Sequence, residues 1–233
     1  MKEAKYNDDQ GVLRYSIVTS GKRLTDEEVD QVCESIRKIK EETNIEVCFS
    51  FGLLKEEQLR KVREAGATRA HCNLETSRRY FPEICTTHTY DQKIETLKAA
   101  VAAGLSICSG GIMGLGETLE DRVDMVLTVK ELGVKSVPVN FLNPIPGTPY
   151  ADNKPLTDEE ARQCVAVFRF IIPDASIRLA GGRGLLDDKG RECFQSGANA
   201  AISGDMLTTA GITVQKDMEM LKDLGYKPQL WED

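Results

Sequence analysis

The sequence contains seven cysteines, and they are its first candidates for a functional site because thiolates bind soft metals and iron–sulfur clusters. They stand at positions 33, 48, 72, 85, 108, 164 and 193 of 233 residues. No two lie within four residues of each other, so no CxxC-type metal knuckle is present. Their odd number in a chain of this length argues against a disulfide framework. Any metal site that shares these thiols must therefore be built by the fold.

Two glycine-rich stretches could bring the backbone close to a ligand. The first, SGGIMGLGE at 109–117, ends an expected strand and opens an expected helix, and the second is GGRG at 181–184. Glycine permits close approach of the backbone, and a helix N-terminus favours anions. The pattern indicates a ligand-binding loop, although many α/β loops share it.

Alternating apolar strands and amphipathic helices must position these residues. We expect strands at 13–19, 45–51, 69–75, 106–112, 136–142, 176–180 and 200–204, and helices at 25–42, 55–65, 90–103, 119–132, 158–171, 189–197 and 214–224. This βα repetition predicts a parallel sheet with helices outside, in one domain over 1–233. Seven strands are one short of a closed barrel, and residues 1–10 read as the tail of a helix. We therefore expect an incomplete (β/α)8 TIM-type barrel whose first βα unit is missing; an open doubly wound sheet is the alternative.

Local signals support these boundaries. Thr25 and Glu28 form a capping-box pattern at the start of the first long helix. Gly66, Gly104 and Gly133 stand where helices end in a left-handed residue. The longest loop, 143–157, follows a strand, which is where barrel enzymes place functional loops.

Side-chain alternation along the strands sorts residues into an outer, helix-facing set and an inner set. The apolar set Ile45, Val47, Phe49 and Phe51 must face the helices, so Cys48 points inward. Applied to every strand, the rule predicts an inner set of polar residues: Ser16, Cys48, His71, Asn73, Glu75, Cys108, Asn140 and Arg178. Buried polar groups are costly unless paired or bound, so either a structural network or a ligand must satisfy this set. Two thiols together with a guanidinium favour a bound, anionic metal–sulfide cluster.

The remaining cysteines have other expected places. Cys33, Cys164 and Cys193 share helix faces with apolar residues and are expected in the core. Cys72 points outward by alternation. Cys85 lies in the loop segment ICTTHTYD after a strand, where core and site are equally open.

Charge and hydropathy limit the partners. The net charge is −7 with no basic block, which argues against nucleic acid or an anionic membrane as partner. No apolar run approaches the roughly 20 residues of a membrane helix. The first ten residues, MKEAKYNDDQ, are too polar for a signal peptide, so we expect a cytoplasmic protein.

Six segments together resemble the biotin synthases of the radical S-adenosylmethionine (SAM) superfamily. They are RYSIVTSGKR, CNLETSRRYFPEICTTHTYDQK, CSGGIMGLGET, SVPVNFLNPIPGTP, IRLAGGRG and GANAAISGDMLTT, in the family's order and spacing over about residues 11–228. The C-terminal part resembles the region that biotin and thiamin synthesis enzymes share. The resemblance implies a sulfurtransferase that cleaves SAM at a [4Fe–4S] cluster. The resulting 5′-deoxyadenosyl radical activates dethiobiotin, and an auxiliary cluster of [2Fe–2S] or variant type donates sulfur to form biotin.

The resemblance also assigns residues, position by position. Cys48 and Cys108 match auxiliary-cluster cysteines, and Arg178 matches the family's arginine ligand. Asn73 and Glu75 match SAM-contacting positions, and Asn140 matches a dethiobiotin-contacting position. The SAM-side element that includes Gly110, Gly111, Ile112 and Glu117 matches the superfamily's GxIxGxxE pattern. His71 stands where asparagine is common, so it is a further candidate for the substrate side.

Two departures from the family stand out. Ser16 occupies a position where many members have a third cluster cysteine, and Cys85 is a candidate to replace that thiolate. The CxxxCxxC loop that holds the SAM cluster is absent from the sequence. We therefore expect an N-terminally truncated chain that does not generate the radical by itself.

Alternatives and partners follow from the same resemblance. A radical SAM family of hydrogenase-maturation or methylornithine-synthase type is one alternative, and a non-catalytic fragment is the other. Dethiobiotin, a flavodoxin or ferredoxin reductant and a second copy in a homodimer are the expected partners.

Overall fold

The computed structural model describes residues 1–204 and 211–230. The segment GANAAISGDMLTT, at 197–209, therefore lies partly outside the described residues. The described chain forms two compact units. The first comprises residues 1–72 and 91–108 with the C-terminal segment from 227, and the second comprises 73–90 and 109–226.

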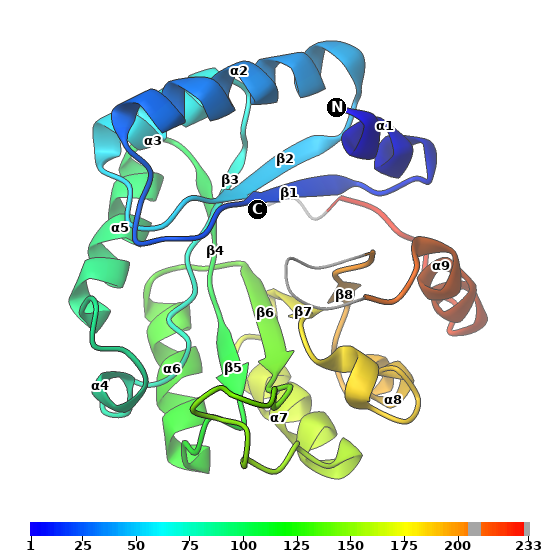
Figure 1. Ribbon diagram of the computed structural model, residues 1–233. Helices are drawn as coiled ribbons and strands as arrows, with labels where there is room; N and C mark the ends of the chain where they lie inside the picture. The colour runs from blue at the N-terminus through cyan, green and yellow to red at the C-terminus, as the bar shows by residue number, and fades with distance from the viewer. Residues whose placement is uncertain (205–210, 231–233) are drawn as a thin grey trace. The chain divides into compact units, whose positions relative to one another are not determined.

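The first unit is a set of parallel strands with helices between them (Figure 1). In chain order its elements are α1 (Lys2–Asp9), β1 (Arg14–Val18), α2 (Asp26–Glu42), β2 (Glu46–Ser50), α3 (Glu56–Glu64), β3 (Arg69–His71), α5 (Tyr90–Ala102, of which Tyr90 belongs to the second unit) and β4 (Ser106–Cys108). Each strand pairs in parallel with the next one along the chain. The crossover helices make this arrangement possible, since parallel neighbours cannot be joined by a hairpin.

Helix α2 shows how the sequence builds this unit. Thr25 caps its N-terminus, and the Glu28 carboxylate accepts a hydrogen bond from the Thr25 backbone N–H in return. The buried face carries Val29, Cys33 and Ile36 at helical spacing. The capping box predicted from the sequence is thus confirmed, as is the core placement of Cys33.

The second unit continues the same βα repetition. Its elements are α4 (Phe81–Ile84), β5 (Gly111–Met113), α6 (Leu119–Glu131), β6 (Ser136–Phe141), α7 (Asp158–Ile171), β7 (Ser176–Leu179), the 3₁₀ turn η1 (Arg183–Leu185), α8 (Arg191–Gln195), β8 (Ala200–Ala201) and α9 (Val214–Asp223). Strands β5 to β8 are parallel and follow one another in chain order. No helix or strand interrupts residues 142–157, so the long loop after β6 is where the sequence predicts it.

Three predicted strands differ from the structure. The strand expected at 69–75 ends at His71, and Glu75, at the far end of the expected range, has a φ of 71° that a strand residue does not adopt. Glu75 keeps one isolated bridge, to Gly111. The strand expected at 106–112 is divided into β4 and β5, since the Gly110 N–H donates to the Asn73 side chain rather than to a neighbouring strand. The strand expected at 200–204 is shorter, at Ala200–Ala201.

Candidate functional site

In the first unit, strand register places both predicted cluster thiols on one face. Cys48 pairs with Ser16 on one side and with Arg69 on the other. His71, two residues after Arg69 and so on the same face, pairs with Cys108. Paired residues of parallel strands project to the same side of the sheet, and Cys48 and Cys108 are 4% and 3% exposed. The alternation argument is therefore confirmed for these two thiols.

His71 lies directly against one of these thiols. Its Nδ1 atom is 3.4 Å from the Cys108 sulfur, within hydrogen-bond distance for sulfur. Ser16 differs from Cys48 in its surroundings, because it is exposed and lies in β1, which pairs only with β2 among the strands of the first unit. The structure thus groups Cys48, Cys108 and His71 as buried or half-buried groups on one face.

Arg69 is a residue that the sequence analysis missed. Its side chain is 1% exposed, it is the register partner of Cys48, and its Nε donates to the Ser106 hydroxyl at 3.1 Å. The same alternation that selected His71 places Arg69 on the inner face, so the signal was present. A buried guanidinium on this face favours an anionic group bound beside it.

In the second unit, Asn73 and Glu75 lie side by side against the start of β5. The Asn73 amide donates to the Glu75 carboxylate at 3.4 Å, and its oxygen accepts from the Gly110 N–H at 3.0 Å. Both backbone groups of Glu75 are hydrogen-bonded. Its N–H donates to the Gly110 carbonyl, and its carbonyl accepts from the Ile112 N–H. A non-glycine residue with positive φ costs about 1–3 kcal/mol and persists only where its surroundings hold it. Such residues concentrate at functional sites.

The glycines at 110 and 111 have a structural reason of their own. A Cβ on Gly110 would lie 2.0 Å from the Pro138 carbonyl oxygen, and one on Gly111 would lie 2.3 Å from the Glu75 carbonyl oxygen. Glycine is therefore needed for neighbouring backbones to pack. Access of a ligand to the same backbone remains a prediction.

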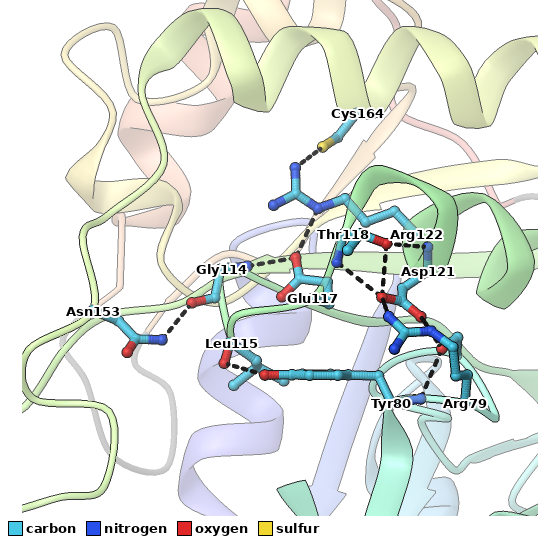
Figure 2. A network of polar contacts seen from close by, with 11 residues as sticks. Arg79, Tyr80, Gly114, Leu115, Glu117, Thr118, Asp121, Arg122, Asn153 and Cys164 are labelled. Atoms are coloured by element: carbon cyan, nitrogen blue, oxygen red, sulfur yellow. Dashed lines mark hydrogen bonds and ion pairs between the residues drawn. The ribbon is translucent and has the colours of Figure 1, made fainter. Parts of the chain in front are cut away.

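Glu117 anchors the turn between β5 and α6 (Figure 2). Its Oε1 accepts from the Gly114 N–H at 2.8 Å and from Arg122 Nε at 2.7 Å, and the side chain is 1% exposed. The second carboxylate oxygen, Oε2, is buried without a hydrogen-bond partner. Arg122 also donates to the Cys164 sulfur at 3.2 Å. Glu117 thus holds its own turn, and one oxygen remains to accept from a ligand or water.

Asn140 and Arg178 lie on neighbouring strands β6 and β7. The Asn140 amide donates to the Gly111 carbonyl at 3.0 Å, and its oxygen accepts from the Gly181 N–H at 2.9 Å. Arg178 donates from Nη2 to the Ser136 hydroxyl at 3.0 Å, while its buried Nε has no hydrogen-bond partner. A buried guanidinium N–H in this state is expected to find an acceptor in a ligand or water.

The other cysteines occupy two environments. Cys164 and Cys193 are buried, as predicted; burial raises the pKa of the Cys164 thiol, and burial together with Asp188 raises the pKa of Cys193 to about 12. Cys72 is also buried, at 8% exposure. Cys85 is half-buried just after α4, with its sulfur 3.5 Å from His88 Nδ1 and 3.6 Å from the Thr87 hydroxyl.

These donors fit one of the two clusters that the resemblance implies. The buried thiols Cys48 and Cys108, on one face of the first unit beside the buried Arg69, match the soft and cationic groups that an auxiliary iron–sulfur cluster requires. In residues 1–204 and 211–230, no three His, Cys, Asp or Glu side chains are grouped to hold a metal ion. The sequence also contains no CxxxCxxC, so its residues do not fit a SAM cluster.

Two family descriptions match consecutive parts of the chain. Residues 1–129 match the Radical SAM superfamily, and residues 138–227 match the Biotin and Thiamin Synthesis associated domain. The two matches together cover both halves of the βα repetition. None of the helices in the described residues has the length and apolar content to cross a membrane.

Similar proteins agree on the family. The chain is 60% identical over 227 residues to the biotin synthase of Akkermansia muciniphila, covering 97% of this chain and 71% of that protein. It is 59% identical over 226 residues to biotin synthase 2 of Corynebacterium diphtheriae, covering 97% and 68%.

Solved structures agree on the fold. Methylornithine synthase matches with a TM-score of 0.83 at 19% identity, over 99% of this chain and 74% of that one. The FeFe-hydrogenase maturase from Carboxydothermus hydrogenoformans matches with a TM-score of 0.78 at 18% identity, over 97% and 57%. The predicted barrel class is thereby confirmed. The families of these two proteins were the near alternatives. They share the fold of this chain at 18–19% identity, whereas the biotin synthases are 59–60% identical to it. The chain belongs to the biotin synthase family of the radical SAM superfamily.

Proposed function

We propose that this chain supplies the auxiliary-cluster ligands and the SAM- and dethiobiotin-binding residues of a sulfurtransferase that converts dethiobiotin to biotin. The observation that carries the proposal is the shared face of β2 and β4, where Cys48 and Cys108 are buried beside Arg69 and His71. Family membership supports the same assignment. When bound, SAM and the clusters supply radical formation and the sulfur atom.

The chain's own residues have distinct proposed tasks. Cys48 and Cys108 would bind the auxiliary cluster as thiolates, and Arg178 is the proposed third ligand, whose charge would offset that of an anionic cluster. Arg69 holds positive charge beside Cys48. Burial of Cys48, Cys108 and Arg69 would exclude water from the cluster's surroundings.

The second unit carries the proposed SAM and substrate contacts. The Glu75 carboxylate and the Asn73 amide offer acceptors and a donor to hydroxyl groups of SAM, and the backbone at Gly110, Gly111 and Ile112 lies beside them. The amide of Asn140 retains a second hydrogen and a second lone pair, which complement the cyclic urea of dethiobiotin.

Anaerobic reconstitution of the 233-residue chain with ferrous iron and sulfide tests the proposal. We expect one iron–sulfur cluster with thiolate-to-iron absorption bands, and loss of these bands in Cys48→Ser and Cys108→Ser. Cys193→Ala is the matched control, because that thiol is buried in α8. Bands that survive both substitutions would overturn the assignment. Loss of the bands in Cys85→Ser would instead make Cys85 the third thiolate.

A second measurement separates the enzyme from the non-catalytic alternative. Because the sequence holds no CxxxCxxC, the 233-residue chain is expected to release no 5′-deoxyadenosine from SAM. Joining the family's cysteine loop to the N-terminus should restore both this product and biotin. Failure of the joined protein to make either product would favour a non-catalytic fragment. A small redox protein as reductant, a homodimer and a cytoplasmic location complete the proposal.

A further inference from the structure

One buried carboxylate joins the two segments that the proposed SAM site needs. Asp121, in the first turn of α6, is 1% exposed and accepts five hydrogen bonds (Figure 2). The Thr118 N–H and hydroxyl donate to Oδ2, each at 2.9 Å. Ser77 Oγ and Arg79 Nε donate to Oδ1 at 2.5 and 3.0 Å, and Arg79 Nη2 donates to Oδ2. Three of the five donors therefore come from another segment, 44 and 42 residues earlier in the chain.

Capping of α6 does not by itself explain these contacts. Two other helices begin with a threonine capping box, Thr25 with Glu28 and Thr157 with Glu160. In both, the residue three positions after the threonine is a glutamate, and its carboxylate accepts hydrogen bonds from that threonine's N–H and hydroxyl. Only the box of α6 uses the shorter aspartate, which is buried and reaches Ser77 and Arg79.

The segment that Asp121 holds follows the strained residue Glu75. Upstream, the Glu75 backbone is bonded to Gly110 and Ile112; downstream, Ser77 is 1% exposed and its hydroxyl also accepts from the Tyr80 N–H at 3.0 Å. The Tyr80 hydroxyl then donates to the Leu115 carbonyl at 3.2 Å. Hydrogen bonds on both sides of Glu75 thus hold its positive φ, and on the C-terminal side Asp121 contributes by accepting from Ser77.

We propose that Asp121 is a positioning residue for SAM, which acts through Ser77 to keep the carboxylate of Glu75 in its binding conformation. The proposal rests on the assignment of Glu75 to the SAM site made above. Asp121 itself need not touch SAM. Burial tends to raise the pKa of its carboxyl, but the hydrogen bonds from Ser77, Thr118 and Arg79 outweigh burial and hold that pKa well below its usual range, so the acceptor stays charged.

Asp121→Glu separates positioning from capping. The other two boxes show that glutamate caps a threonine box, so α6 should keep its cap and the chain its melting temperature. The extra methylene moves the carboxylate away from Ser77 and Arg79. We expect faster amide hydrogen exchange confined to residues 75–80 and about a tenfold weaker affinity for SAM, measured by isothermal titration. Glu160→Gln, which weakens the equivalent box of α7, is the matched control and should leave both readouts unchanged.

Each outcome has a distinct meaning. Suppose that Asp121→Glu leaves the amide hydrogen exchange rates of residues 75–80 at their wild-type values, while Asp121→Asn speeds amide exchange in α6. Asp121 would then only cap its helix, and the positioning role would be overturned. Faster amide exchange at residues 75–80 with an unchanged SAM affinity would overturn the claim that Asp121 affects SAM binding. Absence of SAM binding by the wild-type chain would count against the proposed SAM site, while the exchange arm still decides whether Asp121 holds the segment. Ser77→Ala combined with Asp121→Glu should add little to either single change, because both remove the same bond.

Discussion

At the scale of single residues, the site is made of side chains that satisfy several partners at once. Asn140 bonds the backbone at Gly111 and at Gly181, Glu117 bonds Gly114 and Arg122, and Asp121 accepts five hydrogen bonds. Buried polar groups must be paired, so the same contacts that a ligand site would use also hold the fold together. A substitution at such a residue therefore changes stability as well as binding, and the two effects need separate measurements.

Asp121 should give the chain a specific acid sensitivity. Since its folded-state pKa is lowered, its contribution to stability is fully present above the ordinary aspartate value of about 3.9 and is lost as pH falls below it. In urea titrations from pH 5 down to pH 3, Asp121→Asn should lower the unfolding free energy at pH 5 and flatten its decline toward pH 3. The exposed Asp124 of the same helix offers the matched control, Asp124→Asn, which leaves the hydrogen bonds of Asp121 in place. Equal slopes for Asp121→Asn and wild type would contradict the assignment.

Asn140→Asp should destabilise the second unit even without any ligand. The substitution removes the donor that bonds the Gly111 carbonyl and leaves two acceptors facing each other. A buried acceptor without its donor costs about 1–3 kcal/mol. Urea-induced unfolding measures this loss. An unchanged unfolding midpoint would mean that Asn140 is not held by these bonds in solution.

At the scale of elements, short strands and their glycines decide how the second unit is built. Strand β5 follows Gly110 directly, and each of Gly110 and Gly111 faces a neighbouring backbone carbonyl closer than any Cβ could approach. The division of the predicted strand at 106–112 into β4 and β5 has the same origin, because the Asn73 side chain takes the Gly110 N–H. Gly110 and Gly111 are thus needed in the first place for neighbouring backbones to pack closely.

Gly111→Ala should disrupt β5. The new methyl group would lie 2.3 Å from both the Glu75 carbonyl oxygen and the Met125 sulfur, and the carbonyl belongs to backbone that cannot easily move. Overpacking of this kind costs about 1–3 kcal/mol, measured by urea titration. Gly184→Ala is the matched control, since no atom lies within 4 Å of its added Cβ and its φ is not in the left-handed range. Comparable losses in the two variants would show that glycine itself, rather than the close approach, matters.

At the scale of the whole chain, the distribution of thiols reports on folding. Six of the seven cysteines are buried and Cys85 is half-buried, in one or other of the two compact units. Buried thiols react only when the structure around them opens. Because the cysteines are spread along the chain, their rates of reaction report local opening in both units.

Native-state alkylation should single out Cys85. With iodoacetamide at pH 8, we expect Cys85 to be modified about tenfold faster or more than any other cysteine, as read by peptide mass spectrometry. Cys193 should be among the slowest, because burial and Asp188 raise its pKa to about 12. In urea above the unfolding transition all seven should react at similar rates. Rapid native labelling of Cys48 or Cys108 would show that their shared face is open in solution.

The sequence by itself determined the parallel βα class, the capping box at Thr25, the long loop after β6 and the common face of Cys48 and Cys108. Each follows from a local rule, namely helical spacing, alternation or capping, that operates over a few residues. The family was readable as well, because its segments are contiguous. The assignments of Asn73, Glu75, Asn140 and Arg178 to ligands remain predictions.

Only the tertiary structure decided the positive φ of Glu75, the division of the strand at 106–112 and the contact of Asp121 with Ser77. Alternation assumes an extended backbone, so it cannot foresee that a side chain, Asn73, takes the place of a strand partner. Asp121 looks like one more capping residue in the sequence. Its contact with Ser77, across 44 residues, exists only because the fold brings the two segments together, and no local pattern encodes that proximity.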